Sequence, residues 1–99
     1  MTDVTAALLT AFPAEAVVRG QSVLFGVPDA ARVIDFLRSR NWRVLGVDGF
    51  HTDGSGFRPD LDRIADLSEA THGTESAGRV VDAWQDDPTL YVEFTISAD

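Results

Sequence analysis

Hydrophobic and polar residues alternate along this chain with two different periods, and these periods predict its secondary structure. Apolar positions in residues 4–12 follow helical spacing, with Thr2 or Asp3 available as the N-cap. Residues 16–19 and 22–26 are instead rich in β-branched and aromatic side chains, and the two residues between them begin with glycine. Such a connection is typical of a hairpin, so we expect two antiparallel strands.

The middle of the chain predicts one helix and one strand. A helix capped by Asp29 places a single apolar stripe along residues 30–37. Residues 42–47 are mostly apolar and continue toward Phe50, which predicts a buried strand in the middle of a sheet. The glycines and aspartate of residues 51–56 favour a loop after that strand.

The second half of the chain begins with an ambiguous segment and ends with two clear ones. Residues 59–69 have proline first and acids in the first turn, which predicts a short helix. Leu67 does not fit the apolar face of that helix, so an irregular or partly extended segment is the alternative. A helical stripe starts at Thr74 or Ser76 and stops at the next proline. Residues 90–96 alternate with period two and predict a strand.

This order of elements mixes hairpins with helices, which predicts an α+β fold. We expect a small, mostly antiparallel sheet of about four strands packed by three to four helices. The 99 residues, of which 44% are hydrophobic, suit one core, so residues 1–99 are expected to form a single domain. The first apolar run is too short for a signal core or a membrane span, so we expect a cytoplasmic protein without a membrane partner.

The formal net charge of −8 is unevenly distributed. Residues 48–99 contain 12 acids against 3 arginines, whereas residues 1–47 contain 4 acids against 5 arginines. Binding to phosphates depends on cations, so nucleic acid is not an expected partner. The acidic half would attract a basic protein and speed its association, although plain solubility is the simpler alternative.

Motifs for a cofactor, a metal or a nucleophile are missing from the sequence. The absence of cysteine excludes disulfides, thiolate metal sites and a cysteine nucleophile. A calcium loop starting at Asp48 or Asp53 fails, because Phe50 or Phe57 then occupies a position that needs an oxygen ligand. Neither a phosphate-binding glycine loop nor a G-x-S-x-G elbow occurs. We therefore expect no cofactor, no metal and no catalytic residue.

His51 offers the main alternative, a small enzyme or ligand-binding domain. It lies near Asp48, Asp53 and Arg58 in the sequence and could act as a general base in a cleft. A deep apolar pocket that converges on His51 would favour this alternative, whereas a solvated loop histidine would not. A weaker third hypothesis is a dimer built on an exposed edge strand at residues 90–96.

Acids with phenylalanines between them form the most informative cluster of the chain. The candidate partner-binding residues are Asp48, Phe50, Asp53, Phe57, Asp60, Asp62, Asp66 and Glu69, with Tyr91 as a further anchor. In a helix, Asp62, Asp66 and Glu69 would share one stripe that Arg63 cannot neutralise. Such acids beside aromatic anchors are typical of a face for a cationic partner. The alternative is a solvated face, with the two phenylalanines in the core.

Three segments resemble a known class of proteins: residues 45–50 (Leu-Gly-Val-Asp-Gly-Phe), residues 59–68 and residues 91–94 (Tyr-Val-Glu-Phe). In them the chain resembles the small acidic immunity proteins of bacteria, which are cytosolic inhibitors of secreted or contact-delivered toxins, often basic nucleases. The resemblance implies a noncatalytic protein that binds a cognate toxin through acids and aromatics and blocks the toxin's active site. The slightly basic first half departs from a nuclease inhibitor and leaves a toxin of another activity open.

Overall fold

The computed structural model describes residues 3–98, which form an α+β fold around one antiparallel sheet. The elements in chain order are α1 (Val4–Ala11), β1 (Val17–Arg19), β2 (Ser22–Gly26), α2 (Val27–Ser39), β3 (Arg43–Thr52), β4 (Phe57–Asp66), α3 (Gly73–Ala83), a 3-10 turn (Trp84–Asp86) and β5 (Tyr91–Ser97). The strand order is β1-β2-β5-β3-β4. The predicted fold class is confirmed, with five strands in place of about four.

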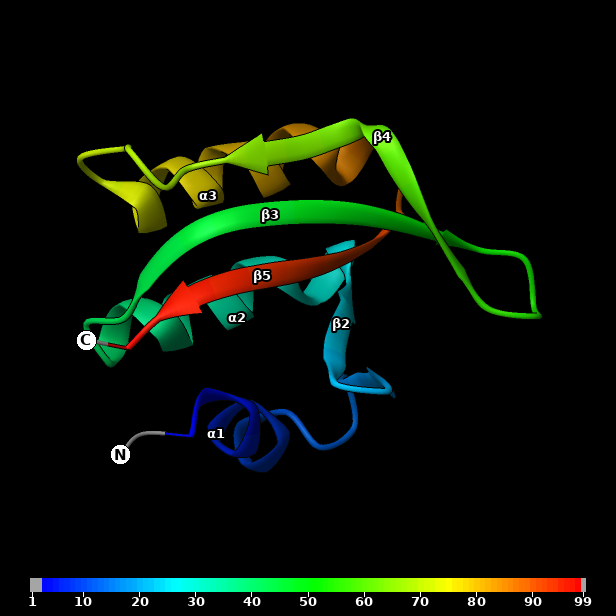
Figure 1. Ribbon diagram of the computed structural model, residues 1–99, viewed down its shortest axis with the longest axis horizontal. Coiled ribbons are helices and arrows are strands. Elements are labelled where there is room, and N and C mark those ends of the chain that lie inside the picture. Colours follow the sequence, from blue (N-terminus) through cyan, green and yellow to red (C-terminus); the bar gives the residue numbers. More distant parts are fainter. Residues whose placement is uncertain (1–2, 99) are drawn as a thin grey trace.

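All of the larger helices lie on one side of the sheet. Figure 1 shows α2 and α3 behind β3, β4 and β5, while the near face of these strands carries no helix. The apolar stripe predicted for α2 is buried against the sheet, as Val33 and Leu37 are fully inaccessible to solvent. Val44 and Val47 of β3 and Val92 of β5 meet that stripe and are equally buried. The core therefore occupies only the helical side of the sheet.

Two of the expected helix caps were wrong and one is confirmed. The α2 helix begins after Gly26, and Asp29 lies within its first turn, where it pairs with Arg32 at 2.9 Å. Thr74 and Ser76, the two residues expected to begin the last helix, both lie inside α3, and the buried Thr74 hydroxyl donates to the Trp42 carbonyl at 3.1 Å. At α1 the Asp3 carboxylate accepts a hydrogen bond from a backbone N–H, as expected. Thr2, the other candidate for that cap, lies outside the described residues.

Residues 57–66 form a strand, so the short helix predicted over residues 59–69 was wrong. Within β4, Ile64 lies opposite Asp48 of β3, whereas Pro59 lies opposite Phe50. Between these two pairs, the four residues 60–63 of β4 face the single Gly49 of β3, so they bulge out of the ladder. Leu67, which did not fit the helix, donates its N–H to a carbonyl of β3 at 2.8 Å and packs against the core.

The last strand lies between β2 and β3 in the strand order, so it is not an outermost strand of the sheet as the third hypothesis had it. β5 pairs with β3 from Tyr91 to Ser97 and with β2 at its first two residues, while β1 and β4 lie at the two ends of the sheet. The α3 helix and its 3-10 turn stop before Pro88, as the sequence predicted. None of the helices in residues 3–98 is long and apolar enough to cross a membrane.

Candidate functional site: the open face of the sheet

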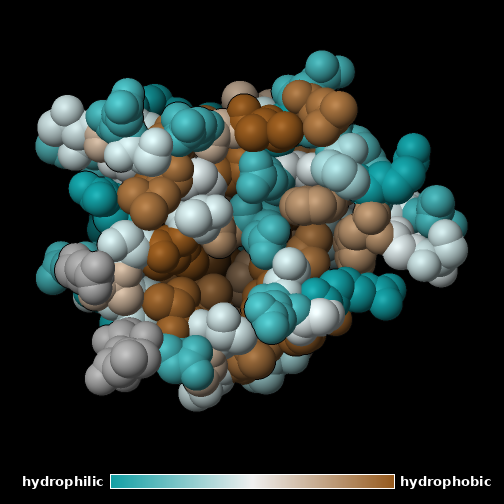
Figure 2. Space-filling model, viewed as in Figure 1, coloured by the Kyte–Doolittle hydropathy of each residue, from teal (hydrophilic) through white to brown (hydrophobic). Residues whose placement is uncertain are grey.

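The side of the sheet opposite the helices brings acids and aromatics from three strands together. Side chains two residues apart on a strand point to the same face, and the intervening Val47 and Val92 point into the core. Asp48 therefore shares the other face with its strand partner Glu93. We call this surface the open face, and its members are Asp48, Phe50, Phe57, Ile64, Asp66, Tyr91 and Glu93. Figure 2 shows hydrophilic and hydrophobic side chains intermixed over it.

Phe50 and Phe57 lie on the open face, half-buried, and are not part of the buried core. Phe50 lies opposite Tyr91 in the β3–β5 ladder. The rings of Phe57 and Tyr91 meet edge to face, with centroids 5.1 Å apart and planes at 78°. The Arg19 guanidinium lies 5.4 Å from the centre of the Phe57 ring. These contacts hold the rings in place, as a binding surface with few conformations to lose requires.

Asp48 and Glu93 form a pair of like charges, and neither has a cation within 4.0 Å among residues 3–98. They lie directly opposite each other on β3 and β5, and both are half-buried. The ion pairs within residues 3–98 involve neither of them, and Asp66 is also without a cation within 4.0 Å. Like charges directly across a sheet destabilise it. A cation bound between Asp48 and Glu93 would therefore lower the electrostatic energy of this face.

Asp66 is held in its ionised form by its neighbour in the chain. The Ser68 hydroxyl donates to Oδ1 of Asp66 at 2.6 Å, and the Ser68 N–H donates to the same atom at 3.0 Å. These two hydrogen bonds lower the pKa of the Asp66 carboxyl below its usual value. A negative charge is thus fixed at the end of β4.

A hollow of about 300 Å³ opens on this face between β3, β4 and β5. Its lining includes the side chains of Leu45 and Ile64, with Asp48 and Asp66 among its acids. Ile64 is 54% exposed, which is unusual for an isoleucine within a sheet. An apolar surface beside two carboxylates suits the long stem and charged head of lysine or arginine.

The remaining predicted acids do not join this surface. Asp53 lies in the turn between β3 and β4, where hydrogen bonds from the Ser55 hydroxyl and N–H lower its pKa. Asp62 is exposed on the bulge of β4, and Glu69 is exposed beyond the other end of that strand. The predicted stripe of Asp62, Asp66 and Glu69 was therefore wrong, because it required a helix.

His51 and Asp60 belong to a separate cluster at the base of the β3–β4 hairpin. His51 Nε2 lies 2.8 Å from Asp60 Oδ2, and this hydrogen bond is the largest cause of the lowered pKa of Asp60. Arg63 completes the cluster between Asp60, Asp86 and Asp87, at 3.4 to 3.9 Å from their oxygens. Arg63 is only 21% exposed, so these acids balance a largely buried cation in the bulge.

His51 has a hydrogen-bond partner in Asp60, but it does not lie in a main hollow of the described residues. Within residues 3–98 no three histidine, aspartate or glutamate side chains lie close enough to hold a metal ion together. Of the residues that the alternative placed beside His51, Arg58 lies opposite it in the β3–β4 ladder, whereas the acid that pairs with His51 is Asp60 and not Asp48.

Glu93, Ile64 and Leu45 are members of the site that the sequence did not single out. Glu93 had a readable signal, because the alternation of residues 91–96 places it on the same side as Tyr91. Ile64 had no such signal, since its exposure depends on the bulge of β4.

No protein-family model matches the chain, and no curated protein matches it significantly. The residues of the open face are therefore the basis for proposing a function.

Proposed function

We propose that this chain is a noncatalytic immunity protein, which binds and neutralises a cognate bacterial toxin in the cytoplasm through its open face. The observation that carries the proposal is the pair of Asp48 and Glu93, two half-buried acids directly opposite each other. The part of the chain that the structure describes supplies neither of them with a cation within 4.0 Å. A basic residue of the toxin between them would relieve their repulsion. The binding partner would thus supply the charge that the sheet lacks.

The aromatics beside this pair supply apolar contact area. The rings of Phe57 and Tyr91 are pre-ordered by their mutual contact, and Phe50 lies opposite Tyr91 on the neighbouring strand, so little conformational entropy is lost when a partner covers these rings. Binding energy in protein interfaces concentrates in such aromatic anchors near the centre of the contact. A rim of acids around them would steer a basic toxin toward the correct orientation.

The hollow beside Ile64 suggests how one residue of the toxin would be held. A lysine or arginine stem would pack on Leu45 and Ile64, and its charged head would reach Asp48 or Asp66. If the toxin is a nuclease, the cations that hold its phosphate substrate are suitable for this contact. Occupying them would block the toxin without any chemistry by the immunity protein.

A rescue experiment tests the proposal. The product of the adjoining upstream gene is expressed as the candidate toxin, with or without this chain, and growth and copurification are measured. We expect complex formation and rescue by the wild type. The double variant D48N/E93Q should lose rescue, whereas D82N/E75Q, which removes the same charge from α3, should retain it. Equal rescue by the two double variants would place the toxin contact elsewhere on the chain.

A further inference from the structure

β5, the middle strand of the sheet, is paired on both sides only at Tyr91 and Val92. β3 pairs with β5 from Tyr91 to Ser97. On the other side, β2 pairs only with Tyr91 and Val92 and then turns away. Figure 1 shows β2 running across the direction of β5. Within residues 3–98, residues 93–97 therefore form a free edge inside the order of the sheet.

The backbone groups of Phe94 and Ile96 point at this free edge. The Val27 N–H donates to the Leu90 carbonyl at 2.8 Å, which fixes the direction of the Leu90 backbone toward β2. Residues two apart on a strand direct their N–H and C=O groups to the same side. Val92, Phe94 and Ile96 therefore continue this row, yet β2 pairs only with Val92. Among the described residues, β2 forms no ladder pair with Phe94 or Ile96, and no loop or turn backbone bonds to them.

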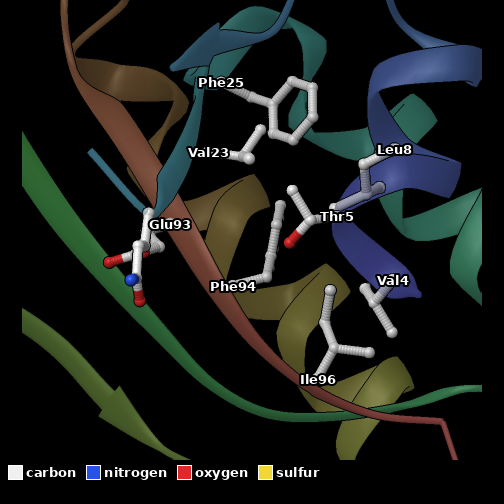
Figure 3. A pocket seen from close by; sticks show the side chains of 9 residues that line it. Val4, Thr5, Leu8, Val23, Phe25, Glu93, Phe94 and Ile96 are labelled. Carbon is white, nitrogen blue, oxygen red and sulfur yellow. The ribbon is translucent and has the colours of Figure 1, made fainter. Parts of the chain in front are cut away.

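A hollow of about 200 Å³ lies along this edge, and its lining combines apolar side chains with the polar Thr5, Gln21 and Glu93. Figure 3 shows Phe94 and Ile96 of β5, Val23 and Phe25 of β2, and Val4, Thr5 and Leu8 of α1 around it. The same depression is visible in Figure 2 beside the open face. A strand placed here would bury alternate side chains among apolar neighbours.

The α1 helix closes the far side of the hollow but cannot pair with the edge. Its backbone N–H and C=O groups point along the helix axis and not sideways at the strand, and Leu8 is its one buried residue among Val4–Ala11. Helices offer no row of free N–H and C=O groups to an adjacent strand. The backbone N–H and C=O groups of Phe94 and Ile96 can therefore be paired by an extended segment but not by α1.

We propose that the free edge of β5 receives an extended segment of the protein partner, which adds an antiparallel strand between β5 and α1. The inference rests on the proposed function in one respect, namely that the partner is a protein. Backbone hydrogen bonds to Phe94 and Ile96 give affinity in such strand addition, and alternate side chains give specificity. The segment carries apolar residues two apart, which enter the hollow beside Phe94 and Ile96.

Charge complementarity defines the residues between those apolar positions. In an antiparallel pair, the intervening residues point to the open face and lie opposite Glu93 and Thr95. A lysine or arginine opposite Glu93 would relieve the repulsion between Glu93 and Asp48. A second copy of this chain is a poor occupant, because it also carries a net charge of −8. The expected segment is therefore an apolar–basic alternation.

A synthetic peptide provides the test. The probe is an acetylated, amidated pentapeptide with the sequence Thr-Val-Lys-Val-Lys, which places its valines opposite Ile96 and Phe94 and its lysines opposite Thr95 and Glu93. Two derivatives carry N-methyl groups, one on the valines and the other on the lysines. The valine N–H groups face β5 in the proposed register, whereas the lysine N–H groups face α1. Amide hydrogen exchange of Phe94 and Ile96 is followed by NMR, with Glu93 and Thr95 as internal references paired to β3.

We expect the parent peptide and the lysine-methylated form to slow exchange at Phe94 and Ile96 by at least about tenfold. The valine-methylated form should leave their exchange unchanged. Equal effects of the two derivatives, no effect of the parent peptide, or protection of Phe94 and Ile96 by dimerisation without peptide would each overturn the strand-addition site.

The two proposals are tested separately. A neutral peptide with threonine in place of lysine should still protect Phe94 and Ile96, in both the wild type and D48N/E93Q, because the backbone contacts do not need these charges. Toxin binding without any peptide protection would overturn the edge site and leave the proposed function standing. Peptide protection without toxin rescue would support the edge site and contradict the proposed function.

Discussion

His51 and Asp60 join across the β3–β4 hairpin, with 2.8 Å between Nε2 of the imidazole and Oδ2 of the carboxylate. The bulge of residues 60–63 brings Asp60 to this position, where the carboxylate also accepts the N–H of Asp62 at 3.0 Å. Arg63 lies on the other side of the same carboxylate, at 3.7 Å. The bulge thus lets one carboxylate, that of Asp60, contact both His51 and Arg63.

Replacing Asp60 by asparagine should destabilise the protein in a pH-dependent way. The pKa of Asp60 is lowered in the folded state, chiefly by the hydrogen bond from His51. A lowered pKa means that the carboxylate stabilises the fold above its unfolded pKa and loses this effect as the pH falls through its folded pKa. Urea unfolding of wild type and Asp60→Asn should therefore differ at pH 7 and converge as the pH falls through the lowered pKa of Asp60. A constant difference at every pH would contradict this role.

Two glycines in α3 should respond in opposite directions to alanine. A Cβ at Gly73 would overlap the Val44 carbonyl oxygen, whereas a Cβ at Gly78 meets nothing within 4 Å. Gly73→Ala should lower the free energy of unfolding by about 1–3 kcal/mol, since the helix must move off β3. Gly78→Ala should raise it by about 0.5–1 kcal/mol through helix propensity. Urea unfolding at pH 7 checks both, and a neutral Gly73→Ala would mean that α3 packs less closely on β3.

The sequence predicted the parts of the fold whose signals are local. The hairpin of β1 and β2, the buried stripe of α2 and the loop after β3 depend on residues within one element, and the structure contains all three. β4 depends on pairing with β3, and its bulge interrupts the alternation that would have revealed a strand. Leu67 was the residue that conflicted with a helix, and it packs inward as the end of an extended segment.

The candidate site was predictable to the extent that its strands were. Asp48, Phe50 and Phe57 were chosen as neighbours in sequence, and β3 and β4 place all three on the open face. Asp60 and Glu69 could not be separated from them, because their positions depend on the bulge and on the end of β4. Glu93 comes from a distant strand, so only the register of β5 against β3 pairs it with Asp48.

Asp48→Asn should make the free protein more stable. The variant removes one of two like charges that lie directly opposite each other. We expect a gain of about 0.2–1 kcal/mol in the free energy of unfolding at low salt, and a smaller gain at high salt. In a double-mutant cycle with Glu93→Gln, the gain should be lost once Glu93 is neutral. Additive effects of the two substitutions would show that the carboxylates do not repel each other.

Ile64→Ala should weaken binding while leaving stability nearly unchanged. The side chain is 54% exposed in the free protein, so its truncation should cost less than about 0.5 kcal/mol of unfolding free energy. In the complex it would line the hollow that receives the toxin side chain, and its loss should raise the Kd by at least about fivefold. Leu61→Ala is the matched control, since Leu61 is 79% exposed and does not line the hollow. Equal effects of Ile64→Ala and Leu61→Ala on Kd would remove the hollow from the interface.

The most direct test of the open face is the rate at which the purified toxin associates with two double variants of equal charge. D48N/E93Q removes the acid pair from the sheet, and D82N/E75Q removes two acids from α3 on the helical side. We expect that D48N/E93Q lowers the association rate constant by about tenfold or more and weakens its dependence on salt. D82N/E75Q should stay close to the wild type. Equal association rates and equal salt dependence for the two variants would contradict a toxin contact at Asp48 and Glu93.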